Sequence, residues 1–203
     1  MRRILWAPAF LIWALLGCGS KESDRGTTVT PPSPVPSSLA CSSSLPQIDD
    51  VVMTCRTHFA ADDSWQIDVV IGSPTTSTDI GGFAFDILFD PTVLTYVPGS
   101  AGWGEMLVQD GITPLFSAET VPGDPGRLVV GIYRPGGQPG VQGTTTYNRI
   151  MVFRVKAVPG VQFDQYPPRL TFDMTRSEAI DSSPSAQAIT SIKFRDQILL
   201  SKQ

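Results

Sequence analysis

Histidine, cysteine and charged residues are scarce in this sequence. His58 is the only histidine among 203 residues, and Asp, Glu, Lys and Arg together make up 17%. A catalytic set built on histidine would have to use His58, but no G-x-S-x-G motif or other pattern draws a nucleophile toward it. We interpret His58 as a solvated loop residue. H-E-x-x-H, D-x-D-x-D-G and Cys/His clusters are also absent, so the sequence names no metal ligands.

Catalysis by paired carboxylates is a weak alternative. It would require acids such as Asp90, Glu105, Asp110 and Glu119 to meet in space, whereas acids in turns mostly cap backbone groups and keep the surface soluble. The sequence therefore predicts no catalytic residue and a protein that is not an enzyme. One cofactor stays open, a calcium ion held by loop aspartates and backbone oxygens, without a ligand set that can be named.

No apolar run is long enough to span a bilayer as a helix, and the longest run stands at the N-terminus. Ile4–Leu16 contains 13 residues after the basic pair Arg2-Arg3. This is too short to span a bilayer as a helix and typical of the apolar part of a signal peptide. The run ends in Leu15-Leu16-Gly17-Cys18, which resembles the lipobox of bacterial lipoproteins. We predict a signal peptide over 1–17 and lipidation of Cys18.

A polar tether is expected after the lipidated cysteine. Residues 18–46 are rich in Ser, Thr and Pro, with TPPSPVPSS at Thr30–Ser38, a composition typical of an extended stalk. Gly19 stands where an inner-membrane retention signal would have Asp, so resemblance to diderm lipoproteins favours the outer membrane. Loss of Arg2 and Arg3 leaves 13 basic against 19 acidic residues, about −6, which argues against a nucleic-acid partner.

Two cysteines remain once Cys18 is lipidated. Cys41 and Cys55 would be exported to a compartment where disulfides persist, and no CxxC indicates a redox or zinc role. A bridge between them would close a loop of about 15 residues and stabilise the fold by roughly 3 kcal/mol. Two free thiols are the alternative.

Residues 47–203 show strand periodicity and no helical periodicity. Apolar residues alternate along at least six segments, separated by Gly- and Pro-rich turns. Examples are Trp65–Ile71, Phe83–Phe89, Leu128–Ile132, Met151–Val155 and Leu170–Met174. The pattern predicts an all-β domain of about nine or ten strands in two packed antiparallel sheets, with a closed barrel as the alternative. Phe83–Phe89 ends at Asp90-Pro91, where Asp90 can accept backbone N–H groups and Pro91 cannot continue a ladder.

The segment GGFAFDILFDPTVLTYVPGSAGW (Gly81–Trp103) resembles the cohesin family. Phe89-Asp90-Pro91 corresponds to the Tyr-Asp-Pro that ends a strand in that family, and Met151–Val155 corresponds to its hydrophobic-x-Phe-x-Val strand. The resemblance covers about residues 50–200 and implies a nine-stranded jelly-roll sandwich, related to several carbohydrate-binding modules. Cohesins bind dockerins through one sheet face. The polar outward residues of dockerin-binding members map here to Gly82 and Ala84, a departure from the family pattern.

Two functions follow as hypotheses. The first is a lipid-anchored module at the cell envelope that binds another protein, with a dockerin-bearing partner as the expectation from the resemblance and Ala84, Asp86, Leu88 and Tyr133 as the candidate binding face. The second is a polysaccharide-binding module with Trp103, Tyr133 and Tyr147 as sugar-stacking aromatics; for Trp103, packing over the core is the preferred interpretation. Val70, Leu88, Val129 and Ile150 lie off the main core face and would form an apolar patch if they gather.

Overall fold

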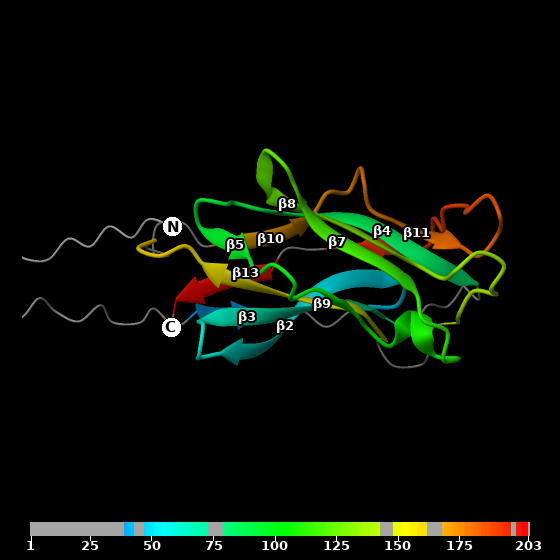
Figure 1. Ribbon diagram of the computed structural model, residues 1–203, viewed down its shortest axis with the longest axis horizontal. Coiled ribbons are helices and arrows are strands. Elements are labelled where there is room, and N and C mark those ends of the chain that lie inside the picture. Colours follow the sequence, from blue (N-terminus) through cyan, green and yellow to red (C-terminus); the bar gives the residue numbers. More distant parts are fainter. Residues whose placement is uncertain are drawn as a thin grey trace, which may run out of the picture. The chain divides into compact units, whose positions relative to one another are not determined.

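Two packed β-sheets form the domain in the computed structural model (Figure 1). The structure describes residues 39–42, 47–72, 79–142, 148–161, 168–195 and 198–202. The predicted leader, Cys18, Tyr147 and most of the predicted tether lie outside these residues. No helix in the described ranges is long and apolar enough to cross a membrane.

Sheet A carries seven strands and sheet B six. Sheet A comprises, in spatial order, β1 (Leu39–Ser42), β13 (Ile198–Lys202), β10 (Arg169–Phe172), β4 (Ile80–Phe89), β8 (Asp124–Tyr133) and β7 (Leu115–Val121), and β11 (Glu178–Asp181) also pairs with β4. Sheet B comprises β12 (Lys193–Phe194), β2 (Asp50–Phe59), β3 (Ser64–Ile71), β9 (Asn148–Ala157) and β5 (Leu94–Tyr96), and β6 (Gly102–Trp103) also pairs with β9. A single turn of 3-10 helix, η1 (Met106–Val108), lies between β6 and β7.

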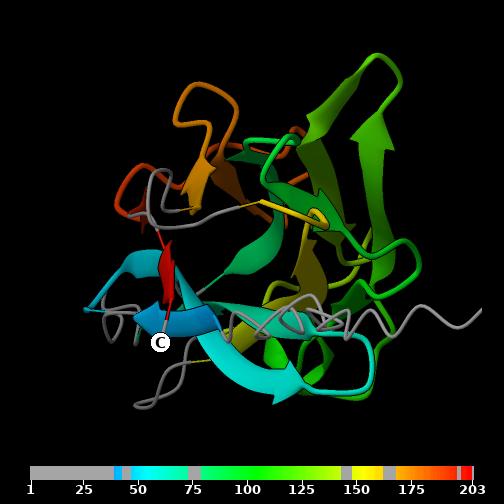
Figure 2. The ribbon, with the colours of Figure 1, turned by 90° about the vertical axis from the view of Figure 1, so that its left-hand side faces the viewer.

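The prediction of an all-β, two-sheet sandwich is confirmed. Every named pair is antiparallel except the two-residue pairing of β12 with β2, which is parallel. The strands outnumber the expected nine because several are very short and because β10 and β11 both lie along β4, separated by a turn. Figure 2 shows the two layers from one end, with β2 and β3 on one side and β7 at the outer margin of the other.

The core lies between the inner faces of the two sheets. Phe83, Phe85 and Ile87 of β4 alternate inward as predicted and are at most 1% exposed. They meet Ile67 of β3 and Phe153 of β9, which are fully buried. Burial of an aromatic or large aliphatic side chain stabilises a fold by roughly 1.5–3 kcal/mol relative to exposure, so this layer is the main source of stability.

Three aspartates end strands or turns in the same way. Asp90 accepts the backbone N–H of Thr92 at 2.8 Å and its hydroxyl at 2.6 Å, which is the corner expected after Phe89. Asp173 binds Thr175 and Asp181 binds Ser183 through the same pair of groups. In each case the side-chain hydrogen bond from the hydroxyl lowers the pKa of the aspartate. Short polar side chains of this kind reverse the chain without a helix or a ladder.

Both ends of the described chain lie at one end of the sandwich. β1 pairs with β13, with Leu39 opposite Lys202 (Figure 1). Cys41 of β1 and Cys55 of β2 form a disulfide with a Cα–Cα separation of 6.0 Å, so the bond joins sheet A to sheet B. β1 falls within the stretch 18–46 that the sequence assigns to the tether. At least four of those residues therefore belong to a sheet.

Two expectations about side-chain direction are wrong. Ile150 is fully buried in the core, so it does not lie off the core face as expected. Val70 is outside the core cluster but only 1% exposed, so it adds nothing to an exposed patch. The cause for Ile150 is a bulge in the pairing of β9 with β3. Val69 pairs with Met151 and the next residue, Val70, pairs with Arg149, so Ile150 is skipped and the alternation of β9 is broken there. Met174 was expected to continue the inward alternation of Leu170 and Phe172, but β10 ends at Phe172 and Met174 is 57% exposed in the turn of Asp173.

Candidate functional site: the outer face of sheet A

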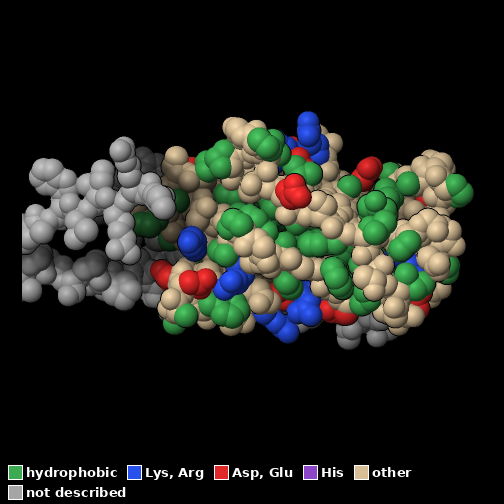
Figure 3. All heavy atoms as spheres, viewed as in Figure 1, with side chains coloured by type: hydrophobic (Ala, Val, Ile, Leu, Met, Phe, Trp, Pro, Cys, Tyr) green, Lys and Arg blue, Asp and Glu red, His purple; other side chains and the backbone are tan. Residues whose placement is uncertain are grey.

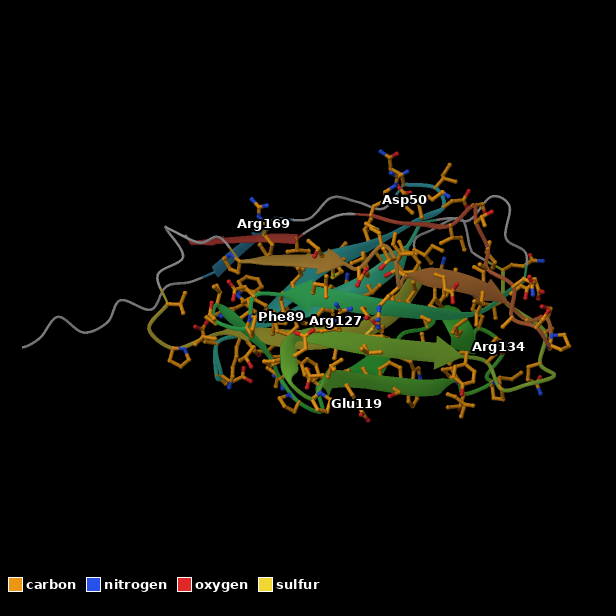
Figure 4. All side chains as sticks on the ribbon, turned by 90° about the horizontal axis from the view of Figure 1, so that it is seen from above. Asp50, Phe89, Glu119, Arg127, Arg134 and Arg169 are labelled. Carbon is orange, nitrogen blue, oxygen red and sulfur yellow. A yellow bond between two sulfur atoms is a disulfide. The ribbon has the colours of Figure 1, made fainter. Side chains whose placement is uncertain are left out.

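Three adjacent strands, β4, β8 and β7, present an apolar outer surface. Figure 4 looks down on these strands, with Arg127 on β8 and Glu119 on β7. The exposed side chains are Leu115 on β7 and Val129 and Tyr133 on β8, with exposed fractions of 49%, 39% and 48%. They account for three of the seven large apolar residues that are exposed in the described ranges, and they lie on one face.

Strand register places these residues in rows across the sheet. Leu115 lies opposite Tyr133, which lies opposite Gly82; Ser117 lies opposite Gly131, which lies opposite Ala84. Gly131 and Ala84 have little or no side chain, so the surface between the larger residues is shallow. A Cβ on Gly82 would stand 2.7 Å from the Ile132 carbonyl oxygen, so glycine there lets β4 approach β8 closely. We call Ala84, Leu115, Val129, Gly131 and Tyr133 the apolar patch.

A network of charges borders the patch on the same face. Arg127 Nη1 donates to Asp86 Oδ2 at 2.7 Å and to Asp173 Oδ2 at 3.0 Å, and its Nε donates to Asp124 Oδ2 at 3.1 Å. Arg176 approaches Asp86 to 3.8 Å. The pKa of the Arg127 guanidinium is raised, chiefly by its hydrogen bond with Asp86. These pairings fix the side chains that adjoin Val129 and hold the border rigid.

The candidate binding-face residues lie on the outer surface, but they are not equally accessible. Tyr133 is exposed, Ala84 and Leu88 are half-buried, and Asp86 is only 4% exposed beneath Arg127. Asp86 therefore orients Arg127 and offers little surface of its own. Sequence reasoning also missed two parts of the face, Leu115 and Gly131. The alternation of Leu115, Ser117 and Glu119 along β7 was the pattern that could have revealed the first.

The candidate sugar-stacking aromatics do not share a surface. Trp103 is 48% exposed but packs edge-on against Phe116, with ring centroids 6.2 Å apart. Phe116 faces the core side of β7, whereas Tyr133 faces outward. Trp103 thus lies on the inner side of sheet A, against Phe116, and Tyr133 lies on its outer side. Among the described residues, Trp103 and Tyr133 form no common stacking surface.

The residues considered for catalysis have separate partners. His58 Nε2 is 2.7 Å from Asp63 Oδ1, and its ring stacks on Trp65 with centroids 4.8 Å apart. Asp90 binds Thr92, Asp110 binds Arg134, and Glu105 binds Arg149. The Arg134 guanidinium lowers the pKa of Asp110 to about 2. Among the described residues, no three His, Cys, Asp or Glu side chains are placed to hold a metal ion.

The outer face of sheet B differs in character. Asp68 of β3 is 3% exposed and lies 3.7 Å from Arg56 of β2 and 3.6 Å from Arg149 of β9. Arg154 pairs with Asp62 on the same side of the domain. Figure 3 shows basic and acidic side chains along the lower side of the view, where sheet B lies. Both outer faces therefore carry ion pairs, and on sheet A these border an open apolar patch.

Solved structures with the same strand arrangement are cohesins. A type II cohesin, A11, from Bacteroides cellulosolvens matches with a TM-score of 0.55 and 13% identity over 75% of this chain and 98% of that one. The domain has a cohesin fold. A type II cohesin from the cellulosome of Acetivibrio cellulolyticus matches with a TM-score of 0.53 and 12% identity, over 75% of this chain and 94% of that one.

A third cohesin-fold match comes from a type I cohesin–dockerin complex of Clostridium thermocellum. Its TM-score is 0.51 and its identity 13%, over 79% of this chain and 97% of the matched chain. No protein-family model matches the sequence, and no curated protein matches it either. The likeness is therefore one of fold, as the Gly81–Trp103 segment predicted.

Proposed function

We propose that this protein is a lipid-anchored, non-catalytic module that binds another protein through the apolar patch of sheet A. The observation that carries the proposal is the contrast between the two outer faces. The outer face of sheet B is crossed by ion pairs of Asp68 and Asp62. The outer face of sheet A exposes Leu115 and Tyr133 opposite each other, with Val129 four residues from Tyr133 along β8. Apolar side chains beside a polar border are typical of protein interfaces.

A dockerin-bearing protein is the partner that the comparisons favour. One solved cohesin with this fold was crystallised in a type I cohesin–dockerin complex. Strand β4 of this chain has Gly82 and Ala84 where the family resemblance implies polar residues in dockerin-binding cohesins. We infer a partner surface that is more apolar than in those complexes.

Replacing Tyr133 with alanine is expected to weaken partner binding about 30-fold, because a half-exposed tyrosine in an apolar patch is a typical interface anchor worth about 2 kcal/mol. The measurement is titration of the full chain with calcium-loaded dockerins of the same organism, by calorimetry. Phe59→Ala, at the far end of sheet B with a similar exposed fraction, is the matched control. Equal affinities for Tyr133→Ala and the unsubstituted chain would place the interface elsewhere.

The anchor is the second half of the proposal. The lipobox Leu15-Leu16-Gly17-Cys18, the short apolar run before it and the Pro-rich stretch after it support attachment through Cys18, with the outer membrane as the proposed site. β1, the first described strand, lies at the opposite edge of sheet A from β7, with β13, β10, β4 and β8 between them.

Replacing Cys18 with serine is expected to move the protein from the membrane fraction to the soluble fraction. Two or more acyl chains contribute about 0.8 kcal/mol per buried CH₂ group, and their loss leaves no comparable attachment. Metabolic labelling with a radioactive fatty acid, followed by fractionation, measures both steps. Cys41→Ser should keep the label. Labelling that survives Cys18→Ser would contradict the anchor.

Polysaccharide binding has weaker support. Trp103 and Tyr133 face different sides of sheet A, and Tyr147 lies outside the described residues. The apolar patch has a single aromatic ring, whereas sugar-stacking surfaces usually align several. We therefore propose the protein-binding role.

A further inference from the structure

β7 is an edge strand with one described partner. It pairs with β8 on one side, and no backbone hydrogen bond from Leu115–Val121 to any other described segment is present. Figure 2 shows β7 at the outer margin of its sheet, and Figure 4 shows it from above in the same position. In an antiparallel pair, alternate residues direct their N–H and C=O groups away from the partner strand, so β7 offers a row of such groups at its outer edge.

Protection against pairing is nearly absent along this edge. Natural edge strands are usually blunted by lysines, prolines, bulges or covering loops. β7 reads LFSAETV: Glu119 is its only charge, it contains no proline, and Leu115 is 49% exposed. Its one irregularity is a register shift against β8 between Thr120 and Val121, at the end of the strand. Pro114 and Pro122 stand immediately outside its two ends. The two prolines limit any added pairing to the seven residues between them.

We propose that β7 pairs antiparallel with β7 of a second copy of this chain, about a twofold axis at Ala118. In this register Leu115 lies opposite Val121 of the other copy, Phe116 opposite Thr120, and Ser117 opposite Glu119. By strand alternation, Leu115, Ser117 and Glu119 share the outer face, and Val121 follows a register shift against β8. The register follows from the sequence of the strand alone, and its symmetry closes the assembly at two copies.

The chemistry of the strand favours a second copy as the occupant. Each Glu119 meets the hydroxyl-bearing Ser117, so like charges are not directly opposite. Two apolar Leu115–Val121 pairs form at the ends of the paired segment, and Ala118 meets Ala118 without steric conflict. The apolar patches of the two copies would then lie on one continuous sheet. Two partner molecules could bind side by side, which would raise the avidity of the surface.

The test is sedimentation of the full chain in mild detergent, over a range of concentrations. The proposal expects a concentration-dependent dimer. In the double variant Leu115→Lys/Val121→Lys, lysine opposes lysine at both outer pairs, and self-association should weaken about tenfold or more. Met174→Lys, which adds a charge at an exposed apolar position in a turn outside β7, should leave self-association unchanged.

A charge reversal tests the register itself. In Leu115→Lys/Val121→Glu, lysine opposes glutamate across the twofold axis, and dimerisation should return to within a few-fold of the unsubstituted chain. A chain that stays monomeric at all concentrations would overturn the proposal. So would a dimer that the double lysine variant leaves intact, or one that the reversed pair fails to restore. Because no dockerin is present in these measurements, the outcome is independent of the proposed partner.

Discussion

Phe85→Ala is expected to lower the free energy of unfolding by about 3–5 kcal/mol, which is the usual cost of deleting a buried phenylalanine. Phe85 is 1% exposed and contacts two other rings. It meets Phe172 edge-on with centroids 5.6 Å apart, and Phe194 at 5.7 Å with the planes tilted by 46°. Phe172 and Phe194 also contact each other at 5.2 Å. The ring cluster therefore joins β4, β10 and β12.

The ring cluster explains why the loss of unfolding free energy should be large for a single substitution. β4 and β10 belong to sheet A and β12 belongs to sheet B, so removal of the Phe85 ring leaves a cavity between the layers, where neighbouring strands cannot easily collapse. Chemical denaturation of the full chain and of Phe85→Ala measures the difference. Phe59→Ala, which removes a ring that is 36% exposed, should cost less than about 1 kcal/mol. Equal losses in the two variants would contradict this account of the core.

The central strand and its corner could be predicted from sequence because the relevant forces are local. Phe83, Phe85 and Ile87 alternate with smaller or polar residues, and one buried face accounts for that pattern. Asp90 and Pro91 end the strand by turn chemistry that depends on adjacent residues only. The cohesin fold was recognised from this same stretch.

Other features could not be predicted because distant segments decide them. Ile150 enters the core through a bulge that depends on how β9 pairs with β3. β7 was missed because its sequence, LFSAETV, mixes apolar and small polar residues and has no clear alternation of apolar with polar residues. Its pairing with β8 identifies it as a strand. The parallel contact of β12 with β2 joins residues far apart in the sequence.

The candidate site shows the same division. Tyr133 and Val129 were expected to share an outward face, since they are four residues apart in one strand, and both are exposed there. The position of Leu115 beside Tyr133 requires the register of β7, and the burial of Asp86 requires Arg127 and Asp173 from two other segments. Alternation assigns a side chain to a face, but it does not tell which neighbours will cover that side chain.

Loss of the Cys41–Cys55 disulfide is the second large effect that we expect. The two residues are 14 apart in sequence, and a bridge closing a loop of this length stabilises a fold by roughly 3 kcal/mol. The bond also holds a weak element in place, because β1 has only four residues and pairs in the described chain only with β13. Without it, β1 should detach before the rest of the sandwich unfolds.

The position of this bond also bears on the proposed anchoring. A chain attached through Cys18 receives any pull at β1, which is the first strand of the domain. The disulfide carries such a pull directly from Cys41 to Cys55 in β2, a ten-residue strand with eight residues paired along β3, so the short β1–β13 ladder is bypassed.

Hydrogen exchange tests both statements about the disulfide. In the double variant Cys41→Ser/Cys55→Ser, amides of β1 should exchange at least about tenfold faster while those of β4 keep a protection that reflects the remaining global stability. Chemically reduced, unsubstituted chain should behave in the same way, which separates loss of the bond from effects of serine. Unchanged exchange in β1 after reduction would show that pairing with β13 alone holds the strand, and the disulfide would then be dispensable for transmitting force.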